Sequence, residues 1–165
     1  MNKLPGLEEI GFGDAFRREL IDLIEKSSIF DDLHPEELSH LSEYIHAYRA
    51  LTGIRLYKEG ERNSHLCLLV EGRLEVHKEV KPGTVKKLAD IRPGRVIGEM
   101  SVIDGYNNSA SVLVAEPSVL LLLTRQNLER LSSEYPALGV KLLWKLATGL
   151  SQRLRQTTGR LVNYL

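Results

Sequence analysis

Hydrophobic positions recur at helical spacing near the start of the chain. Within residues 13–26, Phe16 and Leu20 lie about one helical turn apart, and Asp14 is placed to cap the helix. A second helical unit follows, and Pro35 marks its start because proline lacks only an N–H that has no partner at that position. The N-terminal part of the chain is therefore predicted to form short helices.

From about Ala47 to Leu123 the pattern changes to short apolar runs of the kind that form strands. The strand candidates are residues 48–51, 54–57, 66–70, 74–77, 85–91, 110–115 and 119–123. Turn residues such as Pro82-Gly83 and Pro93-Gly94 connect them. No helices alternate with these strands, so the pattern favours a sandwich, jelly roll or small barrel over an α/β sheet.

The helical period returns after Thr124. A short helix is predicted over residues 125–133, Pro136 breaks it, and a long helix follows over Ala137–Leu161. One face of the long helix carries a heptad seam, and a second stripe can pack on the strands. The seam is Val140, Leu143, Ala147, Leu150, Leu154, Thr157 and Leu161, and the second stripe is Leu138, Leu142 and Leu146.

A helix that is apolar on two faces needs two partners. Its own domain supplies one, and the same helix of another subunit is the second, which predicts a homodimer through Ala137–Leu161. The alternative is that Gly149 and Gly159 end or fray the helix, because each glycine costs about 1 kcal/mol in a helix interior.

Charge is distributed unevenly although the formal net charge is zero. Residues 1–46 hold eleven acidic and four basic residues, whereas residues 137–165 hold five basic residues and no acid. Cations late in a helix complement its dipole or meet an acidic partner. Nucleic acid is disfavoured as the partner because neither interleaved aromatics nor a recognition helix accompanies these charges.

The single cysteine, Cys67, excludes an internal disulfide and fits a reducing compartment. It lies in an apolar run, which is typical of a buried, inert thiol. The first residues lack the features of a signal peptide, and no apolar run is long enough to span a bilayer. We therefore expect a cytoplasmic protein with no membrane partner.

Enzyme chemistry has no support in the motifs. The five histidines lack the spacing of zinc ligands with acids or cysteine, and the sequence carries no P-loop, nucleophile elbow or dinucleotide fingerprint. We expect no catalytic residues and no metal site, and hence a protein that is not an enzyme.

The run from Gly98 to Val112 carries the clearest chemical signal. Gly98 lets the backbone approach a ligand, Glu99 can accept hydrogen bonds from a sugar hydroxyl, and the hydroxyls of Ser109 and Ser111 suit an anion. The run contains no cation, although burying a phosphate away from water needs a compensating charge. The alternative readings are that Glu99 only stabilises a helix dipole and that the serines are ordinary turn and strand residues.

This run resembles the phosphate-binding cassette of cyclic nucleotide-binding domains, as in catabolite activator proteins and the regulatory subunits of cyclic-AMP-dependent kinase. Further motifs occur in the family's order between about Ile29 and Arg155. They are Ile29-Phe30, His34–Leu38, Tyr57–Glu61, Leu68–Leu74 and Ile91–Met100. The resemblance implies a mostly β fold, a β-roll (double-stranded β-helix or jelly roll) with flanking helices. It implies an N-terminal helical extension at 1–28, the nucleotide-binding roll at 29–136, and a dimerisation and lid helix at 137–165.

The resemblance also implies a ligand site in the cassette. Its residues are Gly98, Glu99, Met100, Ser101, Asn108, Ser109, Ala110 and Ser111. Glu99 would bind the ribose 2′-hydroxyl, and the backbone N–H groups around it, with Ser109 and Ala110, would hold the cyclic phosphate. In binding-competent members an arginine pairs with that phosphate, and Asn108 occupies its position here, so the cassette is degenerate. Losing a charge-assisted bond costs roughly 1.5–3 kcal/mol, and Arg73 and Arg95 are the nearby substitutes.

The function implied is a stand-alone regulatory module that binds cyclic AMP, cyclic GMP or a related anion, weakened by Asn108. It needs no cofactor and signals through its C-terminal helix, whose Thr148 and Thr157 are candidates for base contacts, to an unknown effector protein. The alternative is a degenerate fold that serves as a protein–protein interaction module without nucleotide. No DNA-binding domain is expected, because no room for a helix-turn-helix remains after Leu165.

Overall fold

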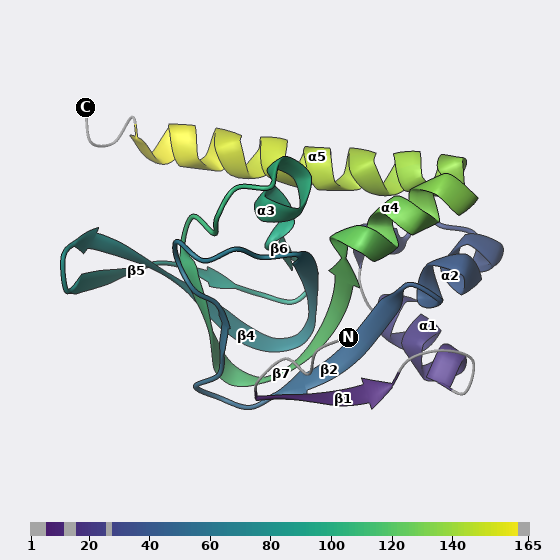
Figure 1. Ribbon diagram of the computed structural model, residues 1–165, viewed down its shortest axis with the longest axis horizontal. Coiled ribbons are helices and arrows are strands. Elements are labelled where there is room, and N and C mark those ends of the chain that lie inside the picture. Colours follow the sequence, from purple (N-terminus) through teal and green to yellow (C-terminus); the bar gives the residue numbers. More distant parts are fainter. Residues whose placement is uncertain (1–5, 12–15, 26–27, 162–165) are drawn as a thin grey trace.

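The computed structural model describes residues 6–11, 16–25 and 28–161, which form a roll of antiparallel strands flanked by helices (Figure 1). The strands are β1 (Leu7–Gly11), β2 (Ile45–Ala50), β3 (Arg55–Tyr57), β4 (His65–Lys81), β5 (Thr84–Ile91), β6 (Val96–Ile97) and β7 (Ser111–Thr124). The helices are α1 (Arg17–Glu25), the 3-10 turn η2 (Ser28–Phe30), α2 (Pro35–Ser42), α3 (Glu99–Asp104), α4 (Arg125–Glu134) and α5 (Pro136–Leu161). The predicted β-roll with flanking helices is confirmed.

Two long strands, β4 and β7, organise the roll. The sheet order is β1-β2-β7-β4-β5, with β3 added to β7 and β6 added to β4. The pairing of β4 with β7 runs from His65 opposite Thr124 to His77 opposite Ser111. This register brings the far half of β4 beside the start of β7, where the cassette ends.

Each long strand joins two of the predicted runs. Gly72 bends β4 without ending it: its φ is +94°, and a Cβ there would lie 2.4 Å from the Pro117 carbonyl oxygen. The glycine is required by this close approach of β7. The runs 66–70 and 74–77 are therefore one strand, as are 110–115 and 119–123.

The sequence pattern missed β1 and β6. β6 has two residues, too few to show a period, and β1 pairs along the edge of β2. The segment predicted as a helical extension thus contributes an edge strand as well as α1. The proposed cap, Asp14, lies outside the described residues.

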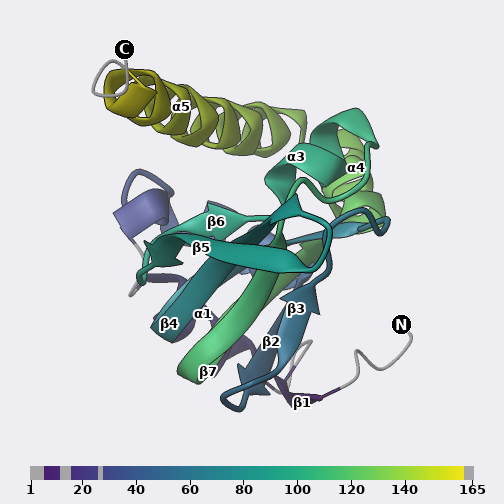
Figure 2. The same ribbon diagram turned by 90° about the vertical axis from the view of Figure 1, so that its left-hand side faces the viewer.

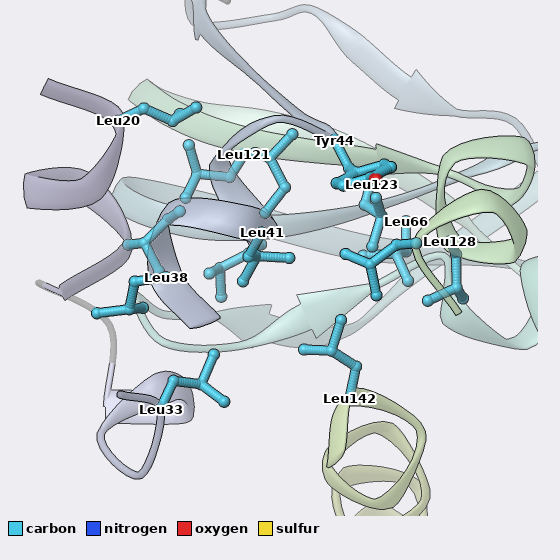
Figure 3. Packing of buried hydrophobic residues seen from close by; sticks show 14 of the residues in the cluster. Leu20, Leu33, Leu38, Leu41, Tyr44, Leu66, Leu121, Leu123, Leu128 and Leu142 are labelled. Atoms are coloured by element: carbon cyan, nitrogen blue, oxygen red, sulfur yellow. The ribbon is translucent and has the colours of Figure 1, made fainter. Parts of the chain in front are cut away.

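The core has two parts. One fills the roll and includes Tyr57, Leu69 and Leu74, and the other packs the helices against the roll (Figure 3). Cys67 lies in the first part, where burial raises the pKa of its thiol. In the described part of the chain, no helix combines the length and apolar character needed to cross a membrane.

Helix α5 is continuous from Pro136 to Leu161, which confirms the predicted long helix, and the alternative that Gly149 and Gly159 end it is wrong. Its predicted second stripe is confirmed, because Leu138, Leu142 and Leu146 are buried against the roll and its helices. Much of the heptad seam is exposed, including Val140, Leu143, Leu154 and Leu161. Figure 1 shows that α5 runs past α3 and extends beyond it, and Figure 2 shows that α3 lies to one side of α5.

Three of the C-terminal cations meet acids of the same chain. Lys141 Nζ lies 2.6 Å from Glu37 Oε1, and Lys145 pairs with Asp32. The lysines lower the pKa of both acidic partners. The third pair, made by Arg153, lies at the cassette. Two of the five basic residues of the tail are therefore paired with acids near the N-terminus and a third with Glu99, an arrangement the charge count did not predict.

Candidate functional site

The cassette begins at Gly98, which connects β6 to α3. Its φ is +76°, and a Cβ at this position would lie 2.7 Å from the Tyr57 ring and 2.9 Å from Asn63 Nδ2. Tyr57 is buried and its hydroxyl donates to the His65 carbonyl, so the ring is fixed. Only glycine fits, and this fit turns the following residue, Glu99, inward.

Glu99 is the most buried acid among the described residues, with a side chain only 3% exposed. Its Oε1 accepts a hydrogen bond of 2.7 Å from Arg153 Nη1 on α5. Its Oε2 is buried and has no hydrogen-bond partner within the described part of the chain. A buried acceptor without a donor destabilises the fold by about 1–3 kcal/mol. This oxygen is therefore suited to a ligand that supplies a hydrogen-bond donor.

A cleft of about 750 Å³ runs between α5 and the segment that precedes the cassette. Glu99 and Arg153 lie in its wall, with Arg95, Thr148 and Trp144 from its two sides. The Arg153 guanidinium also donates to the Val96 carbonyl oxygen over 2.9 Å, which ties α5 to β6. The cleft has the size of a small-molecule site and reaches the buried carboxylate from the side of α5.

Asn108 is turned into the protein. Its Nδ2 donates to the Lys58 carbonyl over 3.1 Å, and its Oδ1 accepts from Ser101 Oγ over 3.2 Å. The backbone N–H of Asn108 donates to the Glu61 carbonyl, and its own carbonyl accepts from Gly60. These bonds fasten the end of the cassette to the turn after β3, so this side chain braces the loop.

The remaining predicted site residues occupy different environments. Met100 is exposed and Ala110 is half-buried, whereas Ser101 is buried and donates its hydroxyl to Asn108 Oδ1. Ser109 is exposed, and its carbonyl accepts a hydrogen bond of 2.7 Å from Lys78 Nζ. Ser111 Oγ accepts from the Glu59 N–H over 3.0 Å. The structure therefore brings Ser109 and Ser111 together at one end of the cassette, with Glu99 at the other.

Neither suggested substitute cation reaches that end. Arg73 is held by Glu75, Asp90 and Glu116 at 2.6–2.8 Å on the outer face of the sheet. Arg95 lies on the wall of the cleft under α5. The cation at the Ser109 end of the cassette is Lys78, at 2.7 Å from the Ser109 carbonyl oxygen.

Sequence reasoning missed Lys78 and Arg153 as site residues. Lys78 carried a weak signal, because it alternates with Leu74 and Val76 along β4 and so shares their face. Arg153 carried none, because it is 54 residues from Glu99 and nothing in the pattern shows which side of α5 meets the cassette.

Comparisons with known proteins agree with this fold. The family model for the cyclic nucleotide-binding domain matches residues 49–135. The cyclic AMP receptor protein of Thermus thermophilus is 29% identical over 130 residues, which are 79% of this chain and 58% of that protein. The cGMP-dependent protein kinase 2 of Mus musculus is 29% identical over 100 residues, 60% of this chain and 12% of the kinase.

The chain thus spans less than two thirds of either relative. A crystal structure of a cyclic nucleotide-binding domain from Methylobacillus flagellatus is similar over the whole length of the present chain. It has a TM-score of 0.85 and 30% identity, and the match covers 100% of this chain and 93% of that one. Since the family model covers more than half of the sequence, the chain belongs to the cyclic nucleotide-binding domain family.

Proposed function

We propose that the protein is a regulatory module that senses cyclic AMP or cyclic GMP through its cassette and signals through α5. The observation that carries this proposal is the buried Oε2 of Glu99, which has no partner within the described residues. A ribose hydroxyl is a donor, and a carboxylate accepts such a hydrogen bond strongly because it is charged. The ligand would satisfy an atom that the chain leaves unsatisfied.

Signal transmission follows from the other oxygen of the same carboxylate. Arg153 holds Glu99 Oε1 at 2.7 Å and belongs to α5, so any change in the hydrogen bonding of Glu99 acts on that helix. A ligand shifts a conformational equilibrium only by its difference in affinity for two states. Here the difference would come from how well Arg153 and the ribose share one buried carboxylate.

The names of two relatives support the ligand class. One is a cyclic AMP receptor protein and the other a cGMP-dependent protein kinase. They leave both bases open for this chain. Thr148 lies in the cleft wall as a candidate contact for the base, whereas Thr157 Oγ1 donates to the Arg153 carbonyl of its own helix.

We also propose that α5 forms a homodimer through its exposed seam. Val140, Leu143 and Leu154 are 45–69% exposed on a long, continuous helix. The double variant Leu143→Glu, Leu154→Glu should sediment as a monomer at tens of micromolar, because it places charge in the seam. Leu51→Glu, on an equally exposed leucine at the β2–β3 turn, is the control and should leave the dimer intact.

A second candidate function is an interaction module that keeps the fold without a nucleotide. Asn108 favours it, because the side chain at the arginine position is neutral and uses its amide on Lys58 and Ser101. In this case α5 would be held against the roll by Arg153 permanently, and its exposed seam would be the functional surface.

Calorimetry with cyclic AMP and cyclic GMP decides between the two. We expect measurable binding to the wild-type protein and a loss of about tenfold in Glu99→Gln, which removes the charge but keeps the shape. Leu51→Glu is the control. Absence of both heat and thermal shift at millimolar nucleotide would reject the sensor and leave the interaction module.

A further inference from the structure

A cyclic phosphate is negatively charged, and holding it at the cassette requires a compensating cation. The inference that follows rests on the proposed function, since it concerns how that same site would hold the phosphate. Asn108 brings no charge, and its amide is already bonded inside the protein. Arg153 is engaged with Glu99 at the opposite end of the cassette.

Lys78 is the cation that lies at the phosphate end. It follows Leu74 and Val76 on the face of β4 that belongs to the interior of the roll. Because His77 pairs with Ser111 across the sheet, the next residue of β4 reaches the end of the cassette. Its Nζ lies 2.7 Å from the Ser109 carbonyl oxygen, beside the residues whose backbone would hold the phosphate.

Lys78 already forms an ion pair with an acid of the same chain. Glu59 Oε1 lies 2.5 Å from Lys78 Nζ, and Glu59 Oε2 accepts from the Glu79 N–H over 3.0 Å. The Glu59 N–H in turn donates to Ser111 Oγ. The carboxylate is therefore fixed next to the cassette hydroxyls, where it neutralises the lysine. Lys78 and the Glu79 N–H lower the pKa of the Glu59 carboxyl, so it stays ionised near neutral pH.

We propose that Lys78 supplies the phosphate-binding charge of this cassette from strand β4, and that Glu59 competes with the nucleotide for it. Lysine binds phosphate as a point charge on a flexible stem, so its ammonium can move from a carboxylate to a phosphate. The phosphate must replace or share an existing partner, and affinity is lowered by that competition. The phosphate-binding cation then lies on β4 instead of at position 108. Competition with the Glu59 carboxylate sets how strongly this cation binds the phosphate.

The two residues have effects of opposite sign, which a purely structural ion pair would not produce. Removing the lysine charge in Lys78→Met should weaken cyclic AMP and cyclic GMP binding about tenfold or more. Removing the competing charge in Glu59→Gln should strengthen binding about three- to tenfold. Lys78→Arg should retain binding. Lys81→Met, on an exposed lysine at the tip of the same hairpin, is the matched control and should bind as the wild type does.

Calorimetric titration of the five proteins with each cyclic nucleotide is the test, with thermal unfolding to confirm that every variant is folded. Equal affinity of Lys78→Met and wild type, or weaker binding by Glu59→Gln, would overturn the inference while leaving the proposed function in place. Binding by Glu59→Gln without binding by the wild type would support the inference and reject the sensor function of the natural chain. Absence of binding by both would reject the two together.

Discussion

The two ends of the cassette are built on the same plan with opposite charges. At the end proposed to bind the ribose (the ribose end) a carboxylate, Glu99, is held by a cation from α5. At the end proposed to bind the phosphate (the phosphate end) a cation, Lys78, is held by Glu59 from the turn after β3. The ends differ in burial. The Glu99 side chain is 3% exposed, whereas those of Lys78 and Glu59 are 40% and 26% exposed.

This difference assigns separate tasks to the two ends. Removing the partner of a buried charge is strongly destabilising, because water cannot reach the charge to take the place of that partner. An exposed pair contributes little to stability, since water and salt screen it. The ribose end should therefore couple the ligand to α5 and to the fold, and the phosphate end should adjust affinity with little effect on either.

The largest effect is expected from Gly98→Ala, which displaces the buried end. The added Cβ would meet the fixed Tyr57 ring at 2.7 Å and would hold a positive φ. We expect a loss of about 3 kcal/mol in the free energy of unfolding by urea, from strain and overpacking together. Gly105→Ala is the control: its φ is also positive, but its nearest atom is the flexible Arg125 Nη1 at 3.5 Å. A similar loss in both variants would contradict the tight packing at Gly98.

Arg153→Met should have the next largest effect, because it leaves the buried Glu99 without its cation. We expect a loss of about 2 kcal/mol, less than for a fully buried pair because Arg153 is 45% exposed. Backbone amides of α5 around Arg153 should exchange faster in hydrogen exchange. Arg155→Met, on an exposed arginine two residues along α5, should change neither quantity. Unchanged exchange in Arg153→Met would mean that packing alone docks the helix.

Asn108→Ala tests the brace at the junction between the two ends. It removes the partners of the Lys58 carbonyl and the Ser101 hydroxyl, and we expect a loss of about 1–2 kcal/mol. Chemical unfolding of the variant measures this loss. The salt dependence of nucleotide binding should not change, since Asn108 carries no charge. An unchanged free energy of unfolding in Asn108→Ala would contradict the role of this side chain as a brace.

The smallest change in stability is expected at the phosphate end. Lys78→Met should alter the free energy of unfolding by less than about 1 kcal/mol, because the pair it breaks is partly exposed. This small value, set beside the loss in Arg153→Met, is the direct measure of the difference between the two ends. Equal losses would remove the distinction.

Much of this arrangement could be predicted from local patterns. The turn glycines, the alternation of apolar and polar residues along β4 and the second stripe of α5 are patterns among residues close in sequence. They predicted the roll, the position of the cassette and the face of α5 that packs on the roll. The prediction failed at Gly72, because this residue separates the predicted strands 66–70 and 74–77 but in the structure only lets β7 approach the bent β4. Strand β1 was missed because five residues at a sheet edge show no clear alternation.

The charges at the site could not be predicted in the same way. Arg153 reaches Glu99 across 54 residues, and Lys78 reaches Ser109 across 31. Such contacts depend on the rotation of α5 and on the register of β4 with β7, which composition and spacing do not encode. That Asn108 stands in the place of a cation stays a prediction, and its role as a brace depends on Lys58 and Ser101 and appears only in three dimensions.

The central claim is that nucleotide binding at Glu99 reaches α5 through Arg153, and the single tryptophan of the chain reports on it. Trp144 lies on α5 in the wall of the cleft and is 70% exposed. Its fluorescence, followed during titration with cyclic AMP or cyclic GMP, should change in the wild type with the same midpoint as the heat of binding. In Arg153→Met binding should persist without that change. Binding by the wild type with constant Trp144 emission, or an equal change in both proteins, would contradict the account.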